Sequence, residues 1–134
     1  MDELILIDTS VWIDFFNSKN SNQVEQLQYL LIHDKPICLC PTILQEVLQG
    51  FEFASKRYEI VKDDLMNQRI LVCEPVMAAI KAAELYQECR KKGVTIRKSN
   101  DCLIAYHAIH FNAKILHCDK DFDLISHHTS LKIL

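Results

Sequence analysis

Short apolar segments alternate with longer stretches of helical spacing along this chain, and the alternation limits the folds that it can adopt. Four segments have the length and composition of strands: residues 4–7, 37–40, 70–73 and 114–117. We expect a final edge strand at residues 131–134. Because strands can pair in parallel only through crossover connections, the pattern predicts an α/β fold: a three-layer α/β/α sandwich with a central, mostly parallel sheet.

Helical patterns fill the segments between these strands. We expect helices just after Asp8, over residues 20–33, 41–50, 53–66 and 75–93, after a cap formed by residues 99–101, and in a short segment ending at Ser126. Gly50 is expected to close the helix that begins at Pro41, because glycine adopts positive φ readily.

The composition is that of one globular unit. A chain of 134 residues with 49% hydrophobic residues can bury a single core, and its two glycines and three prolines form no linker. We therefore expect residues 1–134 to be one domain. No apolar run is long enough for a signal peptide or a bilayer span, which predicts a cytoplasmic protein with no membrane partner. The six cysteines are then expected to be reduced and mostly buried.

Acidic residues stand at four places where an apolar run meets a helical pattern: Asp8, Glu46, Asp101 and Asp119. Ligands of parallel sheets bind beyond the carboxyl ends of the strands, and two of these acids follow strands. Carboxylates are hard oxygen ligands, so a convergent set suits Mg²⁺ or Mn²⁺. Taken singly, each acid has an ordinary explanation as a helix cap or an exposed helix carboxylate.

The charge pattern leaves two interpretations open. A formal net charge of −3 argues against binding nucleic acid through a bulk positive field. Basic residues nevertheless cluster at residues 90–92 and at residues 97–98, the second close to Asp101. These clusters are either solvated helix ends or phosphate contacts. The cysteines and histidines lack the paired spacing of a zinc site, so zinc is not expected.

Four segments, in order, resemble successive blocks of PIN-domain proteins, in particular VapC-type toxins: residues 7–16, 42–47, 100–105 and 118–122. The resemblance covers nearly the whole chain. It implies a Mg²⁺- or Mn²⁺-dependent endoribonuclease that acts on RNA as the toxin of a type II toxin–antitoxin pair. It also implies a homodimer and a small cognate antitoxin protein that inserts into the active-site groove.

The resemblance places the family's four acids on Asp8, Glu46, Asp101 and Asp119. We expect Asp8 and Asp101 to hold the principal metal ion, Asp119 to help hold it or a second ion, and Glu46 to orient or deprotonate the attacking water.

Neighbouring polar residues would complete such a site. Thr9 or Ser10, together with Asn100, would orient the ligands. His117 stands where VapC-like chains often carry a threonine or serine, and Asp121 and Asp123 compete with Asp119 for the fourth acidic position.

Two other functions fit the same acids. An α/β metal-dependent phosphatase or phosphotransfer domain also carries acids at strand ends, although a haloacid-type phosphatase needs an aspartate where Ser10 stands. A catalytically idle PIN-like interaction module would use the acids only as helix caps.

Overall fold

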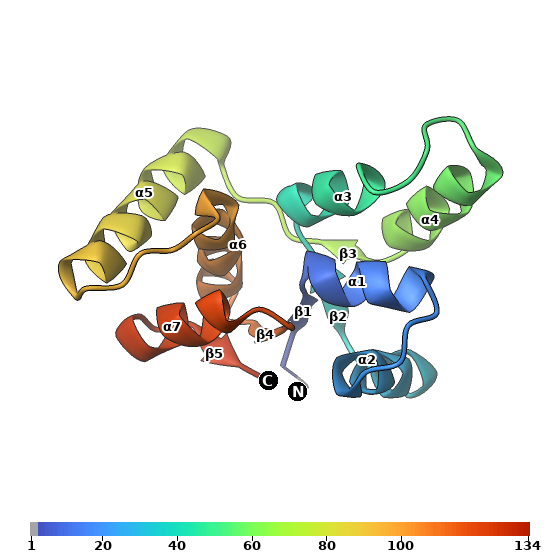
Figure 1. Ribbon diagram of the computed structural model, residues 1–134, viewed down its shortest axis with the longest axis horizontal. Helices are drawn as coiled ribbons and strands as arrows, with labels where there is room; N and C mark the ends of the chain where they lie inside the picture. Colours follow the sequence, from blue (N-terminus) through green and yellow to red (C-terminus); the bar gives the residue numbers. More distant parts are fainter. Residues whose placement is uncertain (1–2) are drawn as a thin grey trace.

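A five-stranded parallel sheet forms the centre of the protein (Figure 1). The computed structural model describes residues 3–134. The strands are β1 (Ile5–Ile7), β2 (Ile37–Leu39), β3 (Arg69–Ile70), β4 (Lys114–Leu116) and β5 (Lys132–Ile133). Their order is β3-β2-β1-β4-β5, so β1 lies between two strands that follow it in the sequence by very different distances. The predicted α/β class is confirmed, and β5 is the expected edge strand.

The helices cover both faces of this sheet. They are α1 (Thr9–Phe16), α2 (Asn22–Ile32), α3 (Pro41–Leu48), α4 (Lys56–Met66), α5 (Pro75–Lys91), α6 (Ser99–His110) and α7 (Lys120–His128). The steps from β1 to β2 and from β2 to β3 run in one direction, whereas β4 and β5 lie on the other side of β1. Since crossovers are right-handed, α1 to α4 cover one face and α5 to α7 the other (Figure 1).

The core lies where these layers meet. Leu6, Leu39 and Ile115 in the central strands are fully buried, as expected for strands covered on both faces. Trp12 from α1 and Phe122 from α7 are the bulkiest side chains in the core. Trp12 is therefore a core residue.

The other aromatic residues of α1 pack beside Trp12. The Phe16 ring stacks on it at 5.8 Å between centroids, and both Phe15 and Phe16 are half-buried. All six cysteines are free, and only Cys118 is exposed. None of the helices in residues 3–134 is both long and apolar enough to cross a membrane.

Several local expectations were wrong. Gly50 does not adopt positive φ; α3 ends at Leu48, and the glycine with positive φ is Gly93, at 83°, after α5. The expected cap at residues 99–101 lies inside α6, whose N-cap is Lys98 and has no side-chain capping bond. The third strand occupies Arg69–Ile70 rather than residues 70–73, and α7 continues to His128, beyond Ser126. Asp101 is consequently free of any capping role.

Candidate active site

Asp8 links the end of β1 to the start of α1. Its backbone N–H donates to the Leu116 carbonyl at 3.0 Å, which holds it beside the end of β4. Asp8 Oδ2 accepts hydrogen bonds from the Ser10 hydroxyl at 2.8 Å and the Ser10 N–H at 3.4 Å. Burial raises the pKa of Asp8, and the Ser10 hydrogen bonds oppose that rise. Asp8 is thus the N-cap of α1 and a buried carboxylate at the carboxyl edge of the sheet, oriented by Ser10.

Asp101 has no such support. Its side chain is only 5% exposed, and its Oδ2 atom is buried without a hydrogen-bond partner. Burial raises the pKa of Asp101 to about 7, and the negative charges of Asp8 and Asp119 add to the rise. A buried acceptor that lacks a partner is costly and rare in folded proteins. A cation placed at this oxygen would satisfy it.

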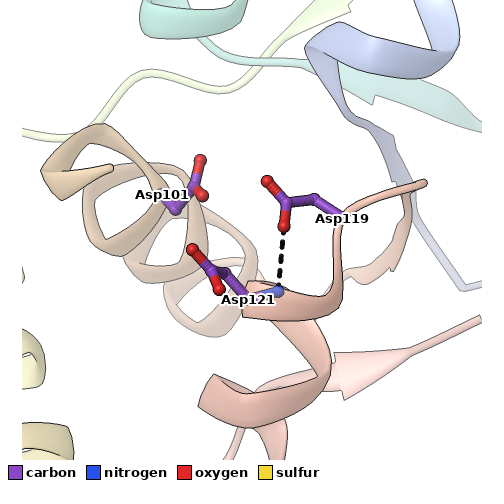
Figure 2. A group of neighbouring side chains, drawn as sticks. All are labelled: Asp101, Asp119 and Asp121. Carbon is purple, nitrogen blue, oxygen red and sulfur yellow. Dashed lines mark hydrogen bonds between the residues drawn. The ribbon is translucent and has the colours of Figure 1, made fainter. Parts of the chain in front are cut away.

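Asp119 and Asp121 bring two further carboxylates to Asp101 (Figure 2). Asp119 is the N-cap of α7, and its Oδ1 atom accepts the Asp121 N–H at 3.0 Å. One carboxylate oxygen from each of the three residues lies within 4.8 Å of the others, a spacing that fits a shared metal ion. Two segments that are far apart in the sequence, α6 and the start of α7, therefore form one anionic cluster.

Two cations border this cluster. Arg97 donates from its backbone N–H and its Nε atom to Asp121 Oδ2, at 3.2 and 3.3 Å, and from Nη2 to Asp119 Oδ1 at 3.2 Å. Lys98 Nζ lies 3.4 Å from Asp119 Oδ2. Burial acts to raise the pKa of Asp119, but the Asp121 N–H, Lys98 and Arg97 outweigh it, and the pKa is lowered overall. Asp119 is the carboxylate that stays ionised, whereas Asp101 resists ionisation.

Glu46 lies on α3, and its carboxylate contacts side chains from α1 and α6. Thr9 Oγ1 donates to Glu46 Oε1 at 2.6 Å, and Asn100 Nδ2 donates to Glu46 Oε2 at 3.5 Å. The Glu46 charge contributes to the raised pKa of both Asp8 and Asp101. The half-buried Glu46 carboxylate is therefore fixed by side chains from α1 and α6.

The four acids predicted from the sequence and the three carboxylates that lie together in the structure overlap only in part. Asp101 and Asp119 both belong to the compact group of three carboxylates, but its third member is Asp121. Asp8 and Glu46 lie outside that group, although their charges act on Asp101. No sequence feature foretold the contacts of Arg97 and Lys98, because these depend on how the start of α6 packs against α7.

His117 has a specific position in the loop between β4 and α7. Its Nδ1 atom accepts the Asp119 N–H at 3.0 Å, and its Nε2 atom lies 3.2 Å from Asp123 Oδ1. The ring nitrogen that accepts cannot carry a proton, so Nε2 carries it and donates to Asp123. His117 therefore holds the backbone of Asp119 in place, and Asp123 is directed at His117.

A groove of about 480 Å³ runs between α5 and the start of α6. Ala82 and Leu103 form part of its apolar wall, and Tyr86 lies along it. Arg97 and Asn100 line the same groove and also contact Asp119 and Glu46, respectively. Two residues that line the groove therefore also contact carboxylates of the candidate site.

Comparison with known proteins identifies the family of this chain. A model of the PIN domain family matches residues 5–127, and the chain belongs to the PIN-domain family. Within that family it is a homologue of VapC ribonucleases. It is 33% identical over 130 residues to VapC ribonuclease Mb1587 from Mycobacterium bovis and, equally, to ribonuclease VapC11 from Mycobacterium tuberculosis, with 96% of each chain covered.

Solved structures share the fold at lower sequence identity. VapBC2 from Rickettsia felis, bound to a DNA fragment from its promoter, gives a TM-score of 0.72 at 19% identity, covering 98% of this chain and 97% of that one. FitAcB from Neisseria gonorrhoeae gives 0.70 at 17% identity, covering 97% and 96%. These likenesses establish the three-dimensional arrangement of the PIN-like sheet and helices.

Proposed function

We propose that the chain is a Mg²⁺- or Mn²⁺-dependent endoribonuclease of VapC type, built as a single nuclease domain over residues 1–134. One observation carries the proposal. Asp101 Oδ2 is buried without a partner beside Asp119 and Asp121, in a chain that is 33% identical to VapC ribonucleases. A divalent cation at this point would satisfy the buried oxygen and could supply the chemistry for hydrolysing RNA phosphodiester bonds.

The donor set fits a hard divalent ion. All the candidate ligand atoms are carboxylate oxygens, which Mg²⁺ and Mn²⁺ prefer. We assign Asp101 and Asp119 as ligands, and Asp8 as a further ligand because its carboxylate is buried at the carboxyl edge of the sheet, beside the end of β4. Asp121 Oδ2 already accepts two N–H groups of Arg97, so Asp121 mainly anchors that residue. When bound, the metal ion neutralises charge on the phosphoryl oxygens and activates water.

Glu46 is the residue that we assign to the attacking water. The Thr9 hydroxyl and the Asn100 amide fix its two oxygens, so the carboxylate is held in one orientation. It is only half-buried, which leaves it within reach of solvent. A carboxylate in this setting can orient water and accept its proton.

The groove between α5 and α6 gives the RNA a path to these residues. Unpaired bases stack on aromatic side chains, and Tyr86 offers such a surface. Arg97 and Asn100, at the end of the groove that meets the carboxylates, are suited to phosphate and sugar contacts. The RNA substrate that best fits this arrangement is a single-stranded loop or end.

We propose that two protein partners regulate the enzyme. The likeness to VapC ribonucleases supports a small cognate antitoxin that inserts into the same groove, making the chain the toxin of a type II pair. Purified product of a small adjacent open reading frame is expected to inhibit cleavage when mixed with the enzyme in equal amounts. Cleavage at the uninhibited rate in the mixture would argue against this partner.

The start of α5 supports a homodimer. Val72, Val76, Met77 and Ile80 are 62%, 67%, 47% and 48% exposed and lie close together in the sequence. Apolar side chains gathered on a surface commonly mark a binding site. Val76→Glu is expected to convert a dimer into a monomer in size-exclusion chromatography with light scattering, while a glutamate at the exposed Ile32 of α2 should not.

Cleavage of a structured RNA tests the activity itself. We expect the purified protein to cut RNA internally in Mg²⁺ or Mn²⁺, to stop in EDTA, and to resume when Mn²⁺ is added in excess. Asp8→Asn and Asp101→Asn should abolish cleavage, and Asp63→Asn, at an exposed position on α4, should leave it unchanged. Cleavage that persists in EDTA would refute metal dependence. A protein that cuts no RNA under any of these conditions would instead be the idle module.

A further inference from the structure

Lys98 reaches into the candidate active site from outside the set of acids. It precedes α6 as the N-cap residue, and its ammonium lies 3.4 Å from Asp119 Oδ2. Its charge also interacts with Asp101 and Asp8. One exposed cation therefore acts on carboxylates from three separate parts of the chain.

The neighbouring Arg97 has a clear structural role, which Lys98 lacks. Arg97 is tied to Asp121 through both its backbone and its side chain, so it fixes the segment that leads into α6. The Lys98 side chain is 65% exposed, and it forms an ion pair with Asp119. Exposed ion pairs of this kind add little to stability. The position of Lys98 is thus explained better by what it does at the site than by folding.

Asp119 is also one of the residues that we assign to the metal ion. An ammonium and a divalent cation that compete for the same carboxylate repel each other. A metal ion held by Asp119 would therefore displace Lys98 from this carboxylate, leaving the ammonium free to pair with another anion. In a ribonuclease, that anion is a phosphate of the bound RNA.

We propose that Lys98 is a phosphate-binding residue whose ammonium moves from Asp119 to the RNA backbone when the metal ion is bound. This inference rests on the proposed function and names the contact that ties substrate binding to metal binding. It gives Lys98 two opposed effects. Lys98 weakens metal binding while no RNA is present, and it strengthens RNA binding once the metal ion is in place.

Lys98→Gln separates these effects, because it removes the charge and keeps a polar side chain of similar length. We expect the dissociation constant for Mn²⁺, measured by calorimetry on the full chain without RNA, to fall about three- to tenfold. At saturating Mn²⁺, KM for RNA should rise about tenfold, and the salt dependence of binding should flatten by about one phosphate contact. Lys98→Arg should restore most of the RNA affinity, since it keeps the charge.

Lys62→Gln is the matched control, because Lys62 forms an exposed ion pair with Glu59 at 2.9 Å on α4. It removes the same charge and should change neither constant. If Lys98→Gln weakens Mn²⁺ binding or leaves it unaltered, or if KM for RNA does not rise, the inference is wrong while RNA cleavage by the parent stands. A parent protein that neither binds Mn²⁺ nor cuts RNA overturns the proposed function, and this inference with it.

Discussion

Replacing Asp101 with asparagine is expected to stabilise the fold while it abolishes metal-dependent cleavage. The parent side chain is buried, its Oδ2 atom has no partner, and three other carboxylates, those of Asp8, Asp119 and Glu46, repel its charge. Asparagine has nearly the same shape and carries no charge. The substitution therefore removes the electrostatic cost and keeps the packing.

The size of this effect depends on pH. The pKa of Asp101 is about 7 in the folded protein, compared with an ordinary value of 3.8. Between these values the folded state keeps a proton that the unfolded chain has released, so the parent loses stability as the pH rises through this window and then levels off. At about 1.4 kcal/mol per pH unit, the cost is a little under about 2 kcal/mol at pH 5 and a little over about 4 kcal/mol at pH 8, a difference of about 3 kcal/mol.

Urea unfolding at both pH values measures the difference. The free energy of unfolding of Asp101→Asn should exceed that of the parent by about 3 kcal/mol more at pH 8 than at pH 5. Asp63→Asn, which removes an exposed charge on α4, should show no such change. Adding Mg²⁺ at pH 8 should raise the free energy of unfolding of the parent, because only the parent keeps the full ligand set. The difference in stability between Asp101→Asn and the parent should therefore become smaller.

Two results would refute this reasoning. If Asp101→Asn has the same effect on stability at pH 5 and pH 8, the carboxylate is not ionising against the charges of its neighbours. If Mg²⁺ stabilises the variant as much as the parent, Asp101 does not contribute to the cation site.

Three further outcomes are expected. Asp8→Asn should keep its circular dichroism spectrum and lose at least about a hundredfold in RNA cleavage, and near-parental cleavage would remove Asp8 from the mechanism. Thr9→Val removes the 2.6 Å hydrogen bond to Glu46, so kcat should fall about tenfold. Thr9→Ser keeps the hydroxyl and should recover part of the activity. An unchanged kcat in Thr9→Val would show that the orientation of Glu46 is unimportant. Asp121→Asn weakens the hydrogen-bonded ion pair that holds the Arg97 segment, so the melting temperature should fall, and an unchanged melting temperature would contradict its anchoring role.

The sequence was most informative where local pattern and topology agree. The run that ends at Ile7 could only be a covered strand, so Asp8 had to lie at its carboxyl edge. Pro41 and Pro75 marked the starts of α3 and α5, because proline at the first turn loses no hydrogen bond. Parallel pairing then follows from the helical crossovers, which is why the fold class was predictable from the sequence, whereas the order of the strands was not predicted.

The sequence-based predictions failed where the outcome depends on contacts that form only when the helices and strands pack together. Ser99 offers a better capping oxygen than Lys98, yet the chain begins α6 at Ser99 because Arg97 is fixed by Asp121 across the interface with α7. The unpaired oxygen of Asp101 is likewise invisible in the sequence. The oxygen is unpaired because α6 packs against the loop after β4, and the sequence of either segment alone does not predict that contact.

The order of the strands also affects how the cell makes this protein. β4 pairs with β1 late in the chain, and Asp119 follows it, so a growing polypeptide that stops at residue 113 carries Asp8, Glu46 and Asp101 but cannot complete the acidic cluster. A ribosome synthesising the nuclease that we propose is therefore not exposed to its activity until the segment that carries β4 and Asp119 has been made. Products that terminate before Asp119 would lack the complete acidic cluster.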